Sequence, residues 1–491
     1  MQQLKNRLIA FYSSLGSRYL PFADVTTPDL PLSRLLRLSL FQISVGMTLV
    51  LLVGTLNRVM IVELGVPAMV VGVMIALPLL FAPLRALIGH KSDTHRCELG
   101  WRRVPYIWRG SLLQFGGYAI MPFAILVLAG RGEAAHAPQW IGYASAAAAF
   151  LLVGAGAHIV QTAGLALATD LTPPESHPRV VGLMYIMLLF GMIGSALLFG
   201  IALDPFYAPR LIQVIQGAAV ACVVLNFIAA WKQEARSANR RPMQSSNDPS
   251  FTEAWAHFCK GAETIHRLMI VGLGTIAFAM SEVLLEPYGG EVLQWTVAST
   301  TKLTALLALG SLVGLAAGSY ILRPGIDPNR ISLFAAALGV PAFALICFAA
   351  PLQADWVFLI GNLLVGIGAA LFAHATLTAT MNQATPGQAG LALGAWGAVQ
   401  ATAAGAGMAI GSILRDAVEF LFGSSASLAG TASEGTGYLT VYALEICLLL
   451  VTIAALIPLV RRTATSSRPS YDANEQGRRL EYSVQTPQKG S

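Results

Sequence analysis

The sequence predicts an all-α membrane protein in which twelve transmembrane helices form two pseudo-symmetric halves of six helices each. Three observations support this fold class. First, 55% of the residues are hydrophobic and 11% are charged, whereas a soluble domain has about 25% charged residues. Second, the apolar residues form runs long enough to cross roughly 30 Å of hydrocarbon as helices. Third, short polar motifs recur at equivalent places in the two halves of the chain.

The apolar runs define six spans on each side of a polar segment. In the first half they are 37–62, 67–88, 105–130, 139–169, 179–204 and 209–231, and in the second half 267–288, 296–322, 331–353, 355–381, 388–414 and 438–460. The chain therefore divides into an N-terminal segment (1–36), a first bundle (37–231), a linker (232–266), a second bundle (267–460) and a tail (461–491).

The segments outside the bundles are polar and basic. Leucines at helical spacing in residues 2–20 indicate either an interfacial helix or a frayed basic tail. The linker contains a capping-box pattern at Ser250–Glu253, which predicts a short amphipathic surface helix. We expect the tail to be disordered.

The basic residues indicate the orientation of the spans. If the N-terminus is cytoplasmic, 26 of the 31 Lys and Arg residues lie in cytoplasmic segments and five lie outside. This asymmetry is the positive-inside pattern, so we expect both termini to be cytoplasmic. Topology also explains the net charge of +6 without a nucleic-acid partner, for which the sequence has no motif.

The sequence contains no constellation typical of catalysis. It has no Gly-rich phosphate loop followed by Lys and Ser or Thr, and no HExxH motif. Its five cysteines lack the spacing of a metal site or a disulfide framework. We therefore expect no enzyme activity, no bound metal and no covalent cofactor.

A densely charged loop, GHKSDTHRCELGWRRVPY (89–106), separates the second and third spans. Its spacing resembles the signature loop of the major facilitator superfamily, which implies a cytoplasmic latch that holds one rocking state of the two halves. The alternative is an ordinary positive-inside loop. The candidate latch residues are those of this loop and of its partial echo after the eighth span: Gly89, Asp93, Arg96, Gly100, Arg102, Arg103, Asp327 and Arg330.

Longer motifs resemble a narrower family, the PucC/LhaA proteins that deliver bacteriochlorophyll and assemble light-harvesting complexes in purple phototrophs. The motifs are GTLNRVMIVELGVPA (54–68), FAPLRALIGHKSDTH (81–95), GWRRVPYIWRG (100–110), LLEPYGGEVL (284–293) and MNQATPGQAGLALGAWGAVQATAAG (381–405). The similarity covers residues 35–460. One departure is Ser281-Glu282, where the family pattern has Gln-Asp, but an acidic group remains.

Three ionisable residues lie inside predicted spans, where charge is costly and is often functional. Arg58 is in the first span, and Glu282 and Glu286 are in the seventh. These spans are symmetry mates that face the central axis in the facilitator fold. We therefore expect Arg58 to pair with Glu282 or Glu286, either as a gate at the outer end or as a static bridge between the halves.

The resemblance to a pigment-delivery family makes intramembrane histidines candidate ligands for the magnesium of a chlorin, because neutral imidazole is a good axial ligand. His158 and His374 occupy repeat-related spans, and Gln161 lies close to His158. Gln161 and Tyr288 are further candidates for pigment binding. Tyr288 lies in Glu286–Gly290, a stretch that is expected either to break its helix at a cavity or simply to end it. The alternative for the histidines is hydrogen-bonded packing.

Two functions are compatible with these features. The resemblance implies a non-enzymatic assembly factor in the bacterial inner membrane, either the cytoplasmic or the intracytoplasmic photosynthetic membrane. Its cargo would be bacteriochlorophyll a, and its partners would be light-harvesting α/β polypeptides, the reaction-centre core complex, the bacteriochlorophyll synthase and the lipid bilayer. The alternative is a proton-coupled facilitator that transports a small solute through Glu282 or Glu286.

Overall fold

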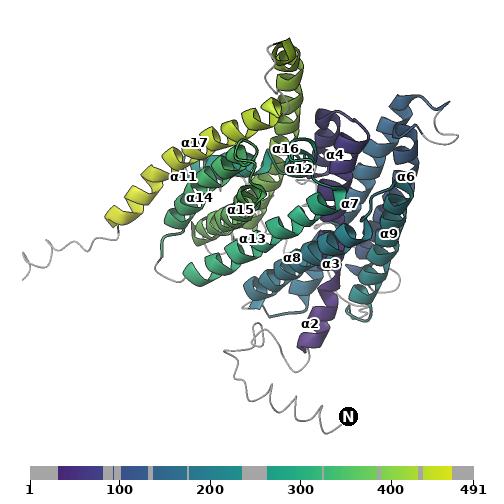
Figure 1. Cartoon of the computed structure of the whole chain (residues 1–491). Helices are drawn as coiled ribbons and strands as arrows, with labels where there is room; N and C mark the ends of the chain where they lie inside the picture. Colours follow the sequence, from purple (N-terminus) through teal and green to yellow (C-terminus); the bar gives the residue numbers. More distant parts are fainter. Residues whose placement is uncertain are drawn as a thin grey trace, which may run out of the picture.

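The computed structural model describes residues 31–80, 92, 101–130, 136–173, 176–234, 262–322, 326–383, 389–428 and 435–466. All regular elements within these residues are helices (Figure 1). In the first half they are α2 (Leu32–Leu38), α3 (Leu40–Leu49), η2 (Val50–Leu56), η3 (Val59–Glu63), α4 (Ala68–Leu80), α6 (Val104–Leu128), α7 (Gln139–Asp170), α8 (His177–Ala202) and α9 (Ala208–Ala230).

The second half has the corresponding set of helices. They are α11 (Ala262–Ala279), α12 (Leu285–Glu291), α13 (Val297–Ile321), α14 (Pro328–Ala349), α15 (Asp355–Gln383), α16 (Ala389–Leu428) and α17 (Thr436–Ser466). In the part of the chain that the structure describes, ten helical stretches are long and apolar enough to cross a membrane, and two apolar helices, Ala68–Leu80 and Thr264–Ala279, are shorter. Together they occupy the twelve predicted spans.

Most span boundaries agree with the sequence to within a few residues, but α16 and α17 are longer than expected. α16 continues to Leu428 and α17 to Ser466, beyond the predicted ends at 414 and 460. The interfacial helix expected at 2–20 and the linker helix expected after Ser250 lie outside the described residues.

The packing of the helices repeats between the two halves. α6 packs on α7 and on α9 in the first half, and α14 packs on α15 and on α17 in the second. The halves meet through α4 with α16 and through α8 with α13, the second span with the eleventh and the fifth with the eighth (Figure 1). A two-fold relation between the halves converts one of these pairs into the other, which is the packing expected of a duplicated six-helix unit.

The first span contains two π-helical segments, η2 and η3, on either side of Asn57 and Arg58. A π-turn closes between residues five positions apart, and such turns are frequent at functional sites. The winding therefore brings Arg58 close to Glu63 on the same span. Spacing rules for an ordinary α-helix do not predict this pair.

The seventh span is broken in its middle. α11 ends at Ala279, residues 280–284 form turns, and α12 begins at Leu285. The sequence places the break at Glu286–Gly290, so the structure moves it upstream. The cause is Pro287, which has no N–H to donate to the carbonyl of Val283, four residues earlier, and is tolerated only in the first turn of a new helix.

Both ends of the described chain lie at the same end of the bundle, where α2 begins and α17 ends (Figure 1). We call this the terminal end and the other the opposite end. α6 begins at the terminal end, and η3 and α4 meet at the opposite end. The polar sites described below are grouped at these two ends and at one level between them.

Candidate functional site

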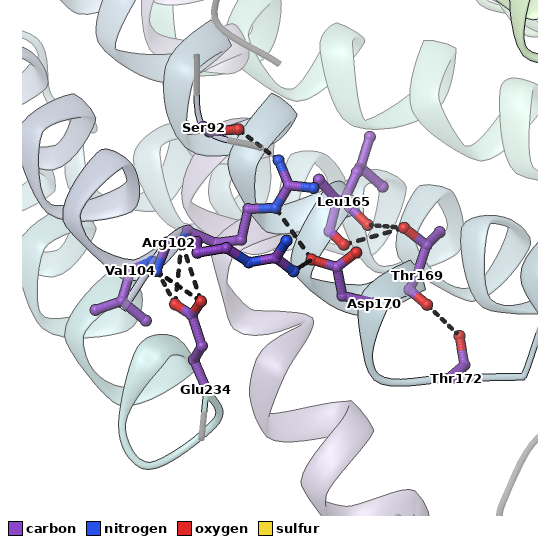
Figure 2. Close-up of polar contacts among 10 residues, drawn as sticks. Ser92, Arg102, Val104, Leu165, Thr169, Asp170, Thr172 and Glu234 are labelled. Atoms are coloured by element: carbon purple, nitrogen blue, oxygen red, sulfur yellow. Dashed lines mark hydrogen bonds and ion pairs between the residues drawn. The ribbon is translucent and has the colours of Figure 1, made fainter. Parts of the chain in front are cut away.

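Two adjacent arginines form the centre of a polar network at the terminal end (Figure 2). Arg102 Nη2 and Arg103 Nε each lie 3.1 Å from the same carboxylate oxygen of Asp170, at the end of α7. Arg103 also donates through Nη1 to the hydroxyl of Ser92. The guanidinium of Arg103 is buried, whereas that of Arg102 is partly exposed, so removal of Arg103 should destabilise this network more than removal of Arg102.

Glu234 completes the network by binding the start of α6. Its carboxylate accepts hydrogen bonds from the backbone N–H groups of Arg102 at 2.7 Å, Arg103 at 3.0 Å and Val104 at 3.0 Å (Figure 2). The first N–H groups of a helix have no partner within the helix, and an anion at this position also interacts favourably with the helix dipole. Glu234 thus links the end of α9 to the start of α6.

The structure places these latch arginines within one half of the molecule. Asp170 and Glu234, which hold Arg102 and Arg103, both belong to the first half. Among the described residues, these partners of Arg102 and Arg103 therefore do not bridge the two halves. Four other predicted latch residues lie outside the described residues: Gly89, Asp93, Arg96 and Gly100.

The partial repeat of the latch motif in the second half, at Asp327 and Arg330, also lies at the start of a helix. The Asp327 carboxylate caps α14 by accepting from the backbone N–H of Asn329 at 3.0 Å. Arg267 of α11 donates to the Asn329 side chain at 3.1 Å. Arg330 is exposed on α14. An acidic side chain therefore caps the third span of each half, although the two carboxylates come from different positions in their repeats.

Arg58 at the opposite end does not form the ion pair that the sequence suggests. Its guanidinium, 3% exposed as a residue, pairs with Glu63 and donates to the backbone carbonyl of Trp295 at 3.2 Å. Neither Glu282 nor Glu286 forms a salt bridge with it among the described residues. The pair expected between Arg58 and Glu282 or Glu286 is thus replaced by a pair between Arg58 and Glu63, because the π-helical winding of the first span brings the Glu63 carboxylate nearer.

Within the described ranges, four hydrogen bonds join the halves toward the opposite end. They run from Arg58 to the Trp295 carbonyl, from Asn57 to the Val283 carbonyl, between the hydroxyls of Thr55 and Thr301, and from the Met69 backbone N–H to Asp416. The bond from Asn57 satisfies the carbonyl that Pro287 leaves without a helical partner. The bond to Asp416 caps α4 of the first half with a side chain from α16 of the second.

A second charged cluster lies beside these bonds, and the sequence did not reveal it. Arg415 pairs with Glu291 and with Asp416, and its guanidinium carbon lies 4.7 Å from the centre of the Tyr438 ring. The Tyr438 hydroxyl donates to Glu291 at 2.7 Å. Arg415 lies beyond the predicted end of its span, so it was counted as a loop residue. Only the continuation of α16 places it within the bundle.

Glu282 and Glu286 line a small cavity between the halves. The cavity has a volume of about 50 Å³, and the second half also contributes Thr304 and Asn362 to its walls. Three apolar side chains of the first half close it, Leu49, Val53 and Met192. A space of this size accommodates a few waters or an ion but not a pigment.

A larger cavity, which we call the α6–α9 groove, lies on the side of the first half that faces away from the second. It has a volume of about 930 Å³. Its aromatic walls are Trp101, Trp108, Phe227 and Trp231, and its polar lining includes Ser111 and Asn226, with Arg34 and Lys232 toward the terminal end. Trp108 is 44% exposed and Trp231 50% exposed, so the groove presents aromatic surface to its surroundings.

The predicted pigment ligands lie elsewhere. None of His158, Gln161, His374 and Tyr288 lines either cavity. The two histidines belong to different halves, and the His374 ring packs against Gly318 of α13. Tyr288 is fully buried among the rings of Phe358, Tyr438 and Tyr442 at centroid distances of 5.4–5.5 Å. Its place in an aromatic core corresponds to packing rather than to a ligand surface.

The sites described above are thus suited to binding a ligand and to holding the two halves in one conformation. Among the described residues no three His, Cys, Asp or Glu side chains are grouped to hold a metal ion. Most of the polar groups described above cap helices, join the halves or line the small cavity, whereas the α6–α9 groove combines aromatic walls with a smaller number of polar groups.

Comparison with known proteins places the chain among close relatives. The family model described as PUCC protein matches residues 55–464. Protein PucC of Rhodovulum sulfidophilum is 61% identical over 85% of this chain and 92% of its own length. Protein PucC of Cereibacter sphaeroides is 53% identical over 94% of this chain and 100% of its own length. A more distant relative, named bacteriochlorophyll synthase 44.5 kDa chain, from Rhodobacter capsulatus, is 29% identical over 80% of this chain.

Solved structures give the fold class. A bacterial homologue of the iron transporter ferroportin in an inward-facing state has a TM-score of 0.64, at 14% identity, over 87% of this chain and 98% of the other. At this identity the likeness shows the fold alone, which is that of the major facilitator superfamily.

Proposed function

The chain belongs to the PucC family, and from that premise we propose that it is a non-enzymatic assembly factor that binds bacteriochlorophyll and delivers it to light-harvesting α/β polypeptides. The cargo is bacteriochlorophyll a, taken up from the bilayer or from the synthase that makes it. The proposed location is the bacterial inner membrane, including its intracytoplasmic photosynthetic part, with both termini cytoplasmic. The antenna polypeptides would receive pigment there, beside the reaction-centre core.

The observation that carries this proposal is the α6–α9 groove. Its volume of about 930 Å³ lies in the range of small-molecule sites, about 300–1,000 Å³. Aromatic side chains provide large apolar contact areas and stack on flat ring systems. A chlorin with an apolar tail matches such a surface better than a polar solute does.

The position of the groove also supports transfer within the bilayer. The groove lies between α6 and α9, on the side of the first half that does not contact the second half (Figure 1). An apolar pigment could enter from lipid and leave toward a neighbouring transmembrane polypeptide without crossing water.

The first test is the pigment content of the purified protein, measured by near-infrared absorbance. We expect the wild type to copurify with bacteriochlorophyll. Trp108→Ala should lower the affinity about tenfold, because loss of one aromatic wall removes about 1.5 kcal/mol. Ala230→Phe, which fills the groove, should lower pigment content as well.

Trp140→Ala is the matched control, because Trp140 is an exposed tryptophan (67%) at the start of α7, outside the groove. Equal pigment loss in Trp108→Ala and Trp140→Ala would contradict a pigment site in the groove. A deletion strain that assembles normal antenna complexes would contradict the assembly function itself.

Proton-coupled transport of a solute is the second candidate, and the observation in its favour is the pair of carboxyl groups, Glu282 and Glu286, beside a cavity between the halves. Uptake of a solute into proteoliposomes under a proton gradient, abolished in Glu286→Gln, would support it. Pigment copurification without such uptake supports assembly instead.

A further inference from the structure

The small cavity between the halves has a polar wall that is not fully hydrogen-bonded. Glu286 is 4% exposed, and its Oε1 accepts a hydrogen bond from the Thr304 hydroxyl. Its Oε2 is buried and accepts no hydrogen bond from the described residues. Asn362 is fully buried, and its amide donates to the Phe358 carbonyl at 2.8 Å, while its Oδ1 has no partner.

A second carboxyl group, Glu282, lines the same cavity and is only partly buried. The cavity therefore collects two carboxyl groups and an amide oxygen, all acceptors. Two buried acceptors without donors cost free energy, and a buried carboxylate without a countercharge costs far more. Such a site lacks one positive charge.

Among the described residues, no basic side chain forms a salt bridge with either carboxyl group of the cavity. The charge of Arg58 on the first span also acts on Glu286 through space, but its guanidinium pairs with Glu63 and donates to Trp295 and forms no salt bridge with Glu286 among the described residues. Lys302 of α13 packs its side chain against Gly200 of α8. A further titratable group nearby, Glu445 of α17, is acidic and accepts from the backbone N–H of Ser281 at 2.7 Å.

We propose that this cavity is a binding site for one monovalent cation, a proton or a sodium ion, held by Glu286 together with Glu282 and Asn362. Carboxylate and amide oxygens are suitable ligands for a small hard cation, and a carboxyl group can take up a proton directly. The volume of about 50 Å³ is enough for an ion or a few waters.

The position of the site couples the bound charge to the contact between the halves. Gly54 of the first half lies so close to Glu286 that a Cβ there would be 2.6 Å from Oε1. The carboxyl group is thus covered by the first half only when the halves are closed at this level. Binding a cation stabilises the closed arrangement, and its release favours access of water to the carboxylate and separation of the halves.

The experiment measures the thermal unfolding midpoint of the full chain in lipid nanodiscs. Wild type, Glu286→Gln and the control Asp355→Asn are compared over a range of pH, in Na⁺ or in a bulky organic cation. Asp355 is an exposed carboxyl residue in the first turn of α15, the helix that carries Asn362.

We expect the wild type and Asp355→Asn to lose stability as pH rises without Na⁺. Recovery on adding Na⁺ identifies the sodium ion as a ligand, and dependence on pH alone identifies the proton. Glu286→Gln, whose amide carries no charge, should show neither dependence. Asn362→Leu keeps the Glu286 carboxyl group but removes the amide oxygen that would bind the cation. We therefore expect this variant to need about tenfold more Na⁺, or about a tenfold higher proton concentration, to reach the same unfolding midpoint as the wild type.

The proposal is overturned if the wild type and Glu286→Gln respond identically to pH and Na⁺, or if the wild type responds to neither. If Glu286→Gln does not fold, the Asn362→Leu titration decides: an unshifted midpoint overturns the site. This experiment does not measure pigment content. Its result therefore tests the cation site independently of the assembly proposal.

Discussion

Single carboxylates decide which helix ends are held together. Glu234 accepts from three consecutive backbone N–H groups at the start of α6, and Asp416 performs a similar role for α4 from the other half. A charged acceptor at a helix N-terminus is among the stronger side-chain contributions to helix stability. In both cases the sequence does not indicate the pair, because capping residue and helix are far apart in the chain.

At this scale we predict that Glu234→Ala lowers the free energy of unfolding by about 1–2 kcal/mol, because three N–H groups lose their acceptor. Thermal unfolding of the purified protein in nanodiscs would measure this loss. Asp204→Asn, at an exposed carboxyl group between α8 and α9, is the control and should be neutral. Equal midpoints for Glu234→Ala and wild type would show that the cap does not contribute.

Arg58 shows where residue-level reasoning is incomplete. The sequence correctly identifies it as a buried charge that needs a partner, but not which partner. An α-helix places neighbours at three and four positions, whereas the π-helical winding selects Glu63, five positions away. The consequence is that Glu286 has no salt-bridge partner among the described residues.

At the scale of elements, the broken seventh span is held to the first by a contact that the break itself creates. Pro287 cannot donate to the Val283 carbonyl, and Asn57 donates to it instead. The break therefore supplies an acceptor on the second half for a donor on the first. The two residues should be energetically coupled.

We predict that Asn57→Ala costs about 1–3 kcal/mol, because the buried Val283 carbonyl is left without a donor. In a Pro287→Ala background, where residue 287 has an N–H, the same substitution should cost much less. A double-mutant cycle on unfolding midpoints measures the coupling. Strictly additive effects would show that Asn57 and Pro287 act independently.

The packing of α6 against α7 depends on glycines at the contact. A Cβ at Gly117 would lie 2.6 Å from Val153 Cγ2 and 2.8 Å from the Ala149 carbonyl oxygen, whereas a Cβ at the adjacent Gly116 would meet nothing within 4 Å. The two positions share a helix and differ only in the face they occupy.

We therefore predict that Gly117→Ala destabilises the protein by about 1–3 kcal/mol through overpacking. Gly116→Ala should be neutral, or stabilising by up to about 1 kcal/mol because alanine favours the helix. The difference between their unfolding midpoints is the measurement. Similar midpoints for both variants would contradict the close approach of α6 and α7.

For the whole molecule, the halves are joined by hydrogen bonds toward the opposite end. Thr55 and Thr301, whose hydroxyl oxygens are 3.5 Å apart, are representative of this contact. The predicted latch was expected to control the rocking from the terminal end, but in the part of the chain that the structure describes, Arg102 and Arg103 pair with Asp170 of the first half.

We predict that Thr55→Cys/Thr301→Cys forms a disulfide across the halves under mild oxidation, because a separation of 3.5 Å between the hydroxyl oxygens is compatible with disulfide geometry. After cleavage at a protease site placed in the linker, the two halves should migrate as one species on a denaturing gel until a reductant is added. Each single cysteine variant is a control for the native thiols. Separate halves without reductant would contradict the closed contact.

The sequence by itself determined the architecture. Twelve apolar runs, the polar linker and the echo at Asp327 and Arg330 predicted two equivalent bundles, because spans in lipid must be helical and of sufficient length. The motifs at residues 54–68 and 284–293 also indicated the family that the comparisons then showed. These are local properties, which a linear chain encodes directly.

Only the tertiary structure decided which side chains meet. It paired Arg58 with Glu63, placed Tyr288 in an aromatic core, and collected Trp101, Trp108, Phe227 and Trp231 around one groove. In an apolar span, hydrophobicity is similar on every face, so the sequence does not tell which face meets a neighbour. Helix winding and close approach at small residues set those contacts, and the candidate sites follow from them.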